Sequence, residues 1–439
     1  MITKQLVQHV LKTSLEDMPE DLVTHAKKSL LNWLGVTIGA IHHETTNILL
    51  KVTNDISSAS HATILGRKEK SDILSAVLVN GTASHIFDFD DTHLDTIHHP
   101  SGPVAPVVFA LGEKHQVDPK VLLRAFILGC EVELRISNSV YPAHYQNGFH
   151  ITASAGVFGA ATAAGIILDL NEEEMAMSLG LAGTQSFGLR ETFGTMTKPF
   201  HPGKAAQNGL LATLLVKNGF TSSEQILEAK SGFLNVYSTK SKSEKILKDW
   251  GDVWEFNKNA FKPYACGIVL HPSIDACIAL TEYATPLEVA EIELTVHPYV
   301  LELTGKENPI TGLEGKFSIY YTCAVAFLDN DASEYQYQDE KVNNQEIIAF
   351  QKKIKPKTDE NMAKDKVFAV LQTYSGKKHE VLIEHATGSL ENPMTQKQIN
   401  QKFKNLCNYL LDKNQMNNVI EKMMHFEELD SIEEILKQI

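Results

Sequence analysis

Residues 151–168 read ITASAGVFGAATAAGIIL and form the longest uncharged run in the chain. The run approaches the length of a membrane span, but it is rich in Ala, Gly, Ser and Thr rather than in Leu and Ile. Small side chains allow helices to approach one another closely. Because no other segment has this character, we predict a buried, tightly packed helix inside a helical protein, and no membrane partner.

Helix-start signals lie on both sides of this run. Asp118 precedes Pro119 in DPKVLLRAFILGCEVELRIS, a good cap and first helical residue. Asn171 precedes three glutamates in NEEEMAMSLGLAGTQSFG, where the helix macrodipole favours acidic side chains. Strand patterns are scarce throughout this half, so we predict a large all-helical domain over residues 1–257.

The pattern changes near residue 258. VAEIELTVHPYV alternates as a strand does, and DKVFAVLQTYSGKKHEVLIEH predicts two strands around the turn SGKK. Between these segments, GKFSIYYTCAVAFLD predicts a buried helix. We therefore predict a mainly α fold, in which a smaller α+β lid domain (258–390) is inserted into the helical domain. Helices in residues 391–439 are expected to rejoin the first part.

Charge and cysteine content narrow the class of protein. The net charge of −14 argues against a nucleic-acid partner, because such binding depends on basic patches. A few cations in a cleft can still bind a small anion. The five cysteines are scattered and odd in number, which is typical of reduced thiols in a cytoplasmic protein. No apolar secretory segment is expected at the N-terminus.

Residues 80–102, NGTASHIFDFDDTHLDTIHHPSG, contain four acidic residues and four histidines. If the segment begins as a helix, His85, Asp88 and Thr92 share one face. Pro100 disfavours helical conformation at His99, which is therefore predicted on a loop. HExxH and EF-hand spacing are absent. Capping or solvated groups, a metal site, and an acid–base pocket all remain open from these residues alone.

Further candidates lie in three other segments. His150 directly precedes the small-residue helix in YQNGFHITASAG. Cations on a Gly- and Pro-rich segment before a helix suit a carboxylate or phosphate, although ordinary surface lysines would give the same pattern. That segment is LRETFGTMTKPFHPGKAAQNGLL, with Arg190, Lys198, His201 and Lys204. FKPYACGIVLHPSIDA adds Lys262 and His271 beside apolar residues.

Together these stretches resemble the MmgE/PrpD family. The resemblance spans nearly the whole chain and rests on five blocks in order: NGTASHIFDFDDTH with HHPSG, NGFHITASAGVFGAA, GTMTKPFHPGKAAQNG, KPYACGIVLHPSIDA and GKFSIYYTCA. The family includes 2-methylcitrate dehydratases, cis-aconitate decarboxylases and an iminodisuccinate epimerase. The resemblance implies a helical domain with a lid domain, a homodimer, and catalysis without a metal or other cofactor.

The family pattern also implies residue roles. The implied catalytic residues are Asp88, His99, His150, Lys198, Lys262 and Tyr321. Thr92 and His271 also match the family pattern and are expected to bind substrate, as are Arg190, His201 and Lys204, which the cation-bearing segment itself suggests. Five other residues of the acidic segment are expected to be caps or solvated groups: Asp90, Asp91, His93, Asp95 and His98.

A lyase acting on a small polycarboxylate follows from the resemblance. Its lysines and histidines would stabilise a carbanion formed next to a carboxylate. Dehydration of a 2-methylcitrate-like substrate is preferred, with cis-aconitate decarboxylation and epimerisation as alternatives. One extra residue between Thr92 and His99, relative to the decarboxylase pattern, bears on the substrate. The rivals from other classes are a metal-dependent hydrolase and a non-catalytic polycarboxylate-binding protein.

Overall fold

The computed structural model describes residues 1–439 and contains 20 α-helices and eight strands. The mainly α fold predicted from the sequence is confirmed. The chain divides into two compact units. Unit 1 comprises residues 1–86, 90–260 and 396–439, and unit 2 comprises residues 87–89 and 261–395. None of the helices combines the length and the apolar character needed to cross a bilayer.

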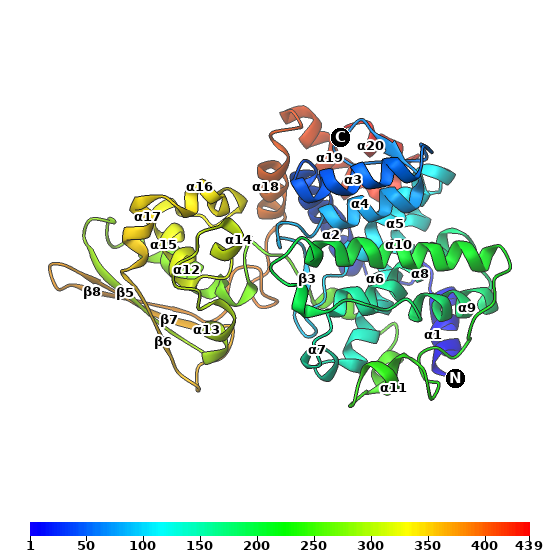
Figure 1. Ribbon diagram of the computed structural model, residues 1–439, viewed down its shortest axis with the longest axis horizontal. Coiled ribbons are helices and arrows are strands. Elements are labelled where there is room, and N and C mark those ends of the chain that lie inside the picture. The colour runs from blue at the N-terminus through cyan, green and yellow to red at the C-terminus, as the bar shows by residue number, and fades with distance from the viewer. The chain divides into compact units, whose positions relative to one another are not determined.

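Helix α8 (Ile151–Ile167) lies in the interior of unit 1 (Figure 1), and all 17 of its residues are buried. This agrees with the buried helix predicted from its small residues, because a helix enclosed on all sides has no polar face. Three long helices pack directly on it: α5 (Ser101–His115), α6 (Pro119–Val140) and α10 (Thr197–Lys217).

Capping residues begin the helices where the sequence predicted. The Asp118 side chain accepts a hydrogen bond from the Lys120 amide at the start of α6. Asn171 and Glu174 form a reciprocal capping box at the start of α9 (Glu172–Gly183). The other helices of unit 1 are α1 (Ile2–Lys12), α2 (Glu20–Ala40), α3 (Glu44–Ile56), α4 (Ile73–Ala83), α7 (Ala143–Gln146), α11 (Phe233–Tyr237), α18 (Gln396–Cys407), α19 (Lys413–Met424) and α20 (Glu433–Leu436).

Unit 1 also contains two short antiparallel strand pairs. β1 (Ala62–Thr63) pairs with β2 (Lys70–Ser71). β3 (Thr92–His93) pairs with β4 (Asn259–Ala260), so the end of the acidic segment is joined to a residue pair far along the chain. This pairing positions the loop that carries His99.

Unit 2 is built on a four-stranded sheet in the order β6-β5-β7-β8. Its strands are β5 (Val289–Val296), β6 (Ile354–Thr358), β7 (Val367–Thr373) and β8 (Lys378–Ile383). Only the β5–β6 pair is parallel. Buried residues alternate along β7, as expected for a sheet with one covered face. The predicted hairpin around SGKK is therefore confirmed.

Helices cover the buried face of this sheet (Figure 1). α12 (His271–Leu280) contacts β7 and β8, and α15 (Ile319–Asp329) contacts β6. α15 is the buried helix predicted from GKFSIYYTCAVAFLD. The remaining helices of unit 2 are α13 (Pro298–Thr304), α14 (Gly312–Gly315), α16 (Asp339–Val342) and α17 (Gln345–Gln351).

One prediction about the acidic segment is wrong. Helix α4 ends at Ala83, so no helix places His85, Asp88 and Thr92 on a common face. Asp88 instead has a left-handed backbone with φ 53°, and Thr92 lies in β3.

Two buried lysines of unit 2 bind the backbone beyond the end of this helix. The Lys316 ammonium donates to the Phe87 carbonyl over 2.6 Å, and the Lys262 ammonium donates to the Asp88 carbonyl over 2.9 Å. Carbonyls engaged in this way do not need the amide partners that a continued helix would provide. The tripeptide 87–89 consequently belongs to unit 2, which the sequence did not predict.

Candidate functional site

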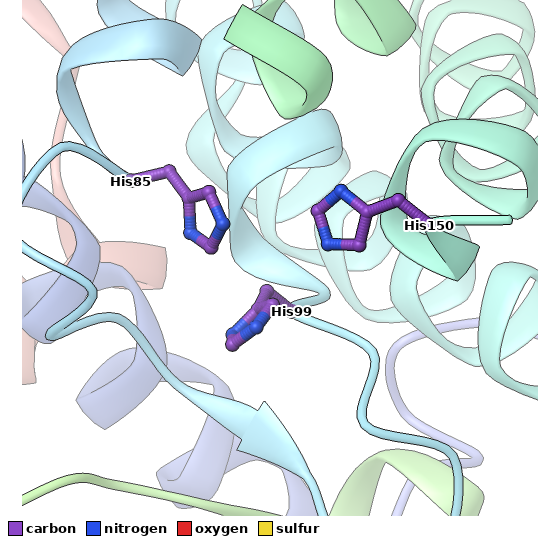
Figure 2. A group of neighbouring side chains, drawn as sticks. All are labelled: His85, His99 and His150. Atoms are coloured by element: carbon purple, nitrogen blue, oxygen red, sulfur yellow. The ribbon is translucent and has the colours of Figure 1, made fainter. Parts of the chain in front are cut away.

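Three histidines from separate segments meet in unit 1. His85 follows α4, His99 ends the loop before α5, and His150 is the N-cap residue of α8. All three are buried. Their ring centroids are 4.6 Å apart for His85 and His99, 5.8 Å for His85 and His150, and 6.3 Å for His99 and His150. Figure 2 shows the rings gathered around one common space.

The position of His99 is set by its loop and by α8. Its main-chain amide donates to the Thr152 hydroxyl over 3.1 Å. Its ring Nδ1 lies 2.9 Å from the Asp91 carbonyl and 3.1 Å from the Thr92 hydroxyl. Because a carbonyl only accepts, these partners assign the proton to Nδ1 and the lone pair to Nε2. Thr92, predicted to bind substrate, thus contacts a histidine that was predicted to be catalytic.

His150 is joined to the Lys198 segment through His201. The Nδ1 atoms of His150 and His201 are 2.9 Å apart, so one imidazole donates to the other. The Phe193 ring contacts both His150, at 5.0 Å between centroids, and the Lys198 ammonium, at 5.3 Å. The structure therefore brings His150, His201 and Lys198 together, as the sequence predicted for three residues of one site.

The two histidines of this pair are held neutral in the absence of an anion. Burial lowers the pKa of His150 well below its ordinary value, and the charges of His85, His201 and Lys198 lower it further. Burial lowers the pKa of His201 to about 4, again reinforced by His85 and Lys198. A polycarboxylate placed here would reverse this repulsion, because its negative charge favours the imidazolium form.

Two aspartates that were expected to be solvated are buried instead. Asp90 is fully enclosed, with Oδ2 2.8 Å from His85 Nδ1 and 3.6 Å from His99 Nδ1. Asp91 accepts from the Ser101 hydroxyl over 2.5 Å and from the Asn259 amide over 2.6 Å. Burial raises the pKa of Asp91 to about 7 despite these two hydrogen bonds. The expectation of solvated carboxylates is wrong because β3 and β4 close over the segment.

His93 and His98 are also buried rather than solvated, whereas Asp95 is exposed. His98 Nδ1 lies 2.8 Å from the Ser137 hydroxyl, and its Nε2 lies 3.2 Å from Glu133 Oε1. Burial lowers the pKa of His98 and raises that of Glu133, so both groups of this pair favour their neutral forms. Because Glu133 and Ser137 belong to α6, these contacts join the loop that carries His99 to that helix.

The histidine cluster has the spacing of a metal site. His85, His99 and His150 each offer one ligand atom, and these atoms lie within 4.8 Å of one another. The Lys198 ammonium shares the Phe193 ring with His150, however, and the Asp90 carboxylate already contacts His85 and His99. These surroundings favour an anion over a cation, and we assign no metal ligands here.

Another set with metal-like spacing is His93, Asp95 and Glu255. Lys258 already pairs with both of its carboxylates, with its ammonium 3.0 Å from Glu255 and 3.8 Å from Asp95. The pKa of Glu255 is lowered to about 2 by hydrogen bonds and charges from His93 and Lys258, which outweigh its burial. We interpret this set as an ion-pair network.

The two remaining cations of unit 1 that the sequence singled out have protein partners. The Arg190 guanidinium stacks 3.9 Å from the Tyr145 ring centroid and donates to the Tyr145 carbonyl. The Lys204 ammonium, on α10, donates to Gln207 over 2.7 Å, and burial lowers its pKa. Their roles in substrate binding stay predictions.

Four of the predicted site residues belong to unit 2. The Lys262 ammonium lies 3.2 Å from Asp88 Oδ1, and both side chains are buried. His271 begins α12, with its ring edge-on to Tyr264. Tyr321 is fully buried in α15 and donates its hydroxyl hydrogen bond to the Gln336 carbonyl. Their catalytic and binding roles remain predictions.

Sequence reasoning missed two members of the cluster, His85 and Asp90. The two residues are only five positions apart in HIFDFD, so the sequence already showed that they could meet. A helix over this segment would place Asp90 on a different face from His85. The non-helical turn through Asp88 is what allows the 2.8 Å contact between them.

Comparison with known proteins identifies the family of the chain. The MmgE/PrpD N-terminal domain matches residues 4–245, and the MmgE/PrpD C-terminal domain matches residues 264–425. A cis-aconitate decarboxylase of Aspergillus terreus is 24% identical over 99% of this chain and 95% of its own length. The mouse cis-aconitate decarboxylase is 28% identical over 81% of this chain and 75% of its own. The human enzyme of the same name is 26% identical over 80% of this chain and 76% of its own.

These matches cover both units of the chain. They confirm the family that the five sequence blocks resembled, and the named relatives are carboxy-lyases, which confirms the predicted enzyme class. The protein is a lyase of the MmgE/PrpD family.

Proposed function

We propose that this protein decarboxylates an unsaturated tricarboxylate of the cis-aconitate kind. The observation that carries the proposal is the group of four buried imidazoles, His85, His99, His150 and His201, next to the Lys198 ammonium. This group suits a ligand with several negative charges and a reaction in which a proton is moved. The relatives named cis-aconitate decarboxylase favour this reaction over the dehydration preferred from the sequence.

The chemistry requires one proton and no net oxidation. In such a substrate the bond between the methylene carbon and its carboxylate breaks, and CO₂ leaves. The freed electron pair forms a new double bond, and the former double-bond pair moves to the CH carbon next to another carboxylate. A proton then bonds to that carbon. The negative charge that develops there is stabilised by nearby cations in a buried site.

The residues of unit 1 can perform each step of this reaction. The Lys198 ammonium binds a carboxylate as a point charge, and the adjacent His150–His201 pair donates hydrogen bonds to the anion. His99, whose Nδ1 lies against the Asp91 carbonyl, places a further imidazole near His85 and His150. General acid–base catalysis of this kind contributes about 10²–10⁴ in rate.

NMR in D₂O tests the proposal directly. The purified enzyme is incubated separately with cis-aconitate, 2-methylcitrate, citrate and iminodisuccinate. The mechanism predicts CO₂ release from cis-aconitate and one deuteron in the saturated methylene of the product, with none in its new =CH₂ group. Dehydration of 2-methylcitrate without decarboxylation of cis-aconitate would replace this proposal, and so would bare C–H exchange in iminodisuccinate.

Two controls separate the rival classes. Metal analysis of the purified protein addresses the hydrolase alternative, since stoichiometric Zn, Mn or Fe that turnover requires would contradict the proposal. A protein that binds all four compounds and transforms none would be a polycarboxylate-binding protein. His25→Gln removes another buried imidazole of unit 1, one that packs on Phe256, and should leave the activity unchanged.

A further inference from the structure

His85 and Asp90 form a buried pair at the edge of the histidine cluster. Both side chains are fully enclosed, and His85 Nδ1 lies 2.8 Å from Asp90 Oδ2. The same oxygen lies 3.6 Å from His99 Nδ1, a longer contact. Asp90 thus contacts the cluster directly, and His85 is the imidazole that it contacts most closely.

This pairing assigns the tautomer of His85. A carboxylate accepts hydrogen bonds, so the proton of the neutral ring lies on Nδ1 and the lone pair lies on Nε2. A carboxylate partner of this kind also fixes the orientation of the imidazole ring.

The Nε2 atom of His85 has no hydrogen-bond partner in the protein and is buried. A buried polar atom without a partner is costly, and such an atom in a native structure requires an explanation. The His85 ring faces the space shared with His99 and His150 (Figure 2). A ligand bound in that space would supply the missing partner.

The other two rings of the cluster are less suited to carry a proton. His150 has another imidazole as its Nδ1 partner, and the Lys198 ammonium contacts the same Phe193 ring. His99 shares its Nδ1 among a carbonyl, a hydroxyl and the more distant oxygen of Asp90. Of the three, only His85 combines a close carboxylate with a buried, unpartnered Nε2.

We propose that His85 is the general acid of the reaction, touching the substrate through Nε2 and delivering the proton to the carbanionic carbon, with Asp90 as its positioning residue. The proposal rests on the carboxy-lyase function proposed above. In the step, the Nε2–H bond of the imidazolium breaks and a C–H bond forms at the carbon beside the carboxylate. Nε2 regains its lone pair, and water reprotonates it after the product leaves.

Turnover by the wild-type enzyme is measured first, so that the two proposals can fail separately. If the wild type transforms no polycarboxylate, the proposed function is wrong. If the wild type decarboxylates, His85→Asn is tested, because the Asn amide can still donate to Asp90 while the Nε2 position is removed. We expect kcat to fall by about 10²–10⁴-fold with little change in the affinity for tricarballylate, an unreactive tricarboxylate.

The same variant should lose the exchange of product methylene hydrogens with D₂O in parallel with kcat, because the exchange uses the same proton transfer. It should also lose the alkaline limb of the kcat–pH profile that reports the imidazolium. His25→Gln is the matched control for removing a buried imidazole and should retain both. A His85→Asn enzyme with near-normal kcat, exchange and pH profile would overturn the proposal.

A double-mutant cycle tests whether Asp90 acts through His85 or through His99. Asp90→Asn should lower kcat more than it raises KM, and Asp90→Glu should recover part of the loss. The His85→Asn/Asp90→Asn double variant should be no slower than His85→Asn alone. Losses that multiply would show that Asp90 acts through another residue and would overturn its assigned role.

A measurement on the wild type keeps the proposal testable if the variants do not fold. In a crystal structure of the wild-type enzyme with tricarballylate, His85 Nε2 should lie within about 3.5 Å of the ligand. A ligand bound at the cluster but separated from Nε2 by another side chain would refute the assignment.

Discussion

Replacement of Gly203 by Ala should separate the two helices that carry much of the site. α4 and α10 cross where Gly81 and Gly203 meet. A Cβ added at Gly203 would lie 2.3 Å from the Leu78 carbonyl oxygen and 2.6 Å from the Thr82 amide nitrogen. These are backbone atoms of α4, so no side-chain rotation relieves the overlap. Ordinary contact begins near 3.4 Å, which requires the helices to move apart by about 1 Å.

That displacement has two measurable consequences. Overpacking of this kind costs about 1–3 kcal/mol in the free energy of unfolding, offset by about 1 kcal/mol from the better helix propensity of Ala. The displacement also changes the spacing between His85, which follows α4, and His201 on α10. A shift of about 1 Å in catalytic groups costs on the order of 100-fold in rate. The loss of activity should therefore exceed what the loss of stability alone would cause.

The assay is kcat/KM for the confirmed substrate together with Tm, measured on the folded fraction. Gly267→Ala is the matched control, because its nearest neighbour would be 3.5 Å away and its φ of −57° suits any residue. It should leave both Tm and kcat/KM near wild type. A Gly203→Ala enzyme with wild-type Tm and kcat/KM would show that the helix crossing tolerates a methyl group, and would refute the argument.

Three further predictions concern charge at the site. Lys198→Met removes the ammonium beside Phe193. KM for a tricarboxylate should then rise by roughly 10–150-fold, the equivalent of about 1.5–3 kcal/mol. An unchanged kcat/KM would exclude a binding role for Lys198. His150 and His201 are neutral in the free site, so binding of a trianion should be accompanied by uptake of a proton by the site. The affinity for the trianion should therefore fall by up to tenfold per pH unit as the pH rises from about 4, the pKa of His201, toward about 6.5. Calorimetry in two buffers of different ionisation enthalpy measures that uptake, and binding without uptake would contradict it. Treatment with EDTA followed by desalting should leave kcat unchanged, because the ammonium of Lys198 near the histidine cluster disfavours a metal ion there. A loss of activity that Zn²⁺ restores would show instead that the reaction needs a metal ion.

Local chemistry made much of the fold predictable. The small residues of α8 indicated burial on all sides, and Asp118 and Asn171 marked helix starts through their own side-chain hydrogen bonds. The hairpin of β7 and β8 followed from alternation around a turn. These features depend on residues close together in sequence, so a single sequence is sufficient to recognise them.

The position of the acidic segment depended on distant residues and was predicted incorrectly. Helix α4 was expected to continue, but Lys262 and Lys316 bind the carbonyls of Asp88 and Phe87, which lie 174 and 229 positions away from them in sequence. No local pattern shows that these lysines reach this tripeptide. The boundaries of unit 2, near residues 260 and 395, lie a few residues from the predicted 257 and 390. Contacts between distant parts of the chain define these boundaries.

The sequence by itself determined the helical class, the main elements and the blocks that carry His99, His150 and Lys198. Only the tertiary structure decided which histidine of the cluster lies closest to a carboxylate. Asp90 looked like a solvated acid in the sequence, and it became a partner of His85 because the chain turns at Asp88 and the β3–β4 pair buries the segment. Burial and hydrogen-bond partners determine the proton affinity of a histidine, and both arise from contacts that form only when the chain folds.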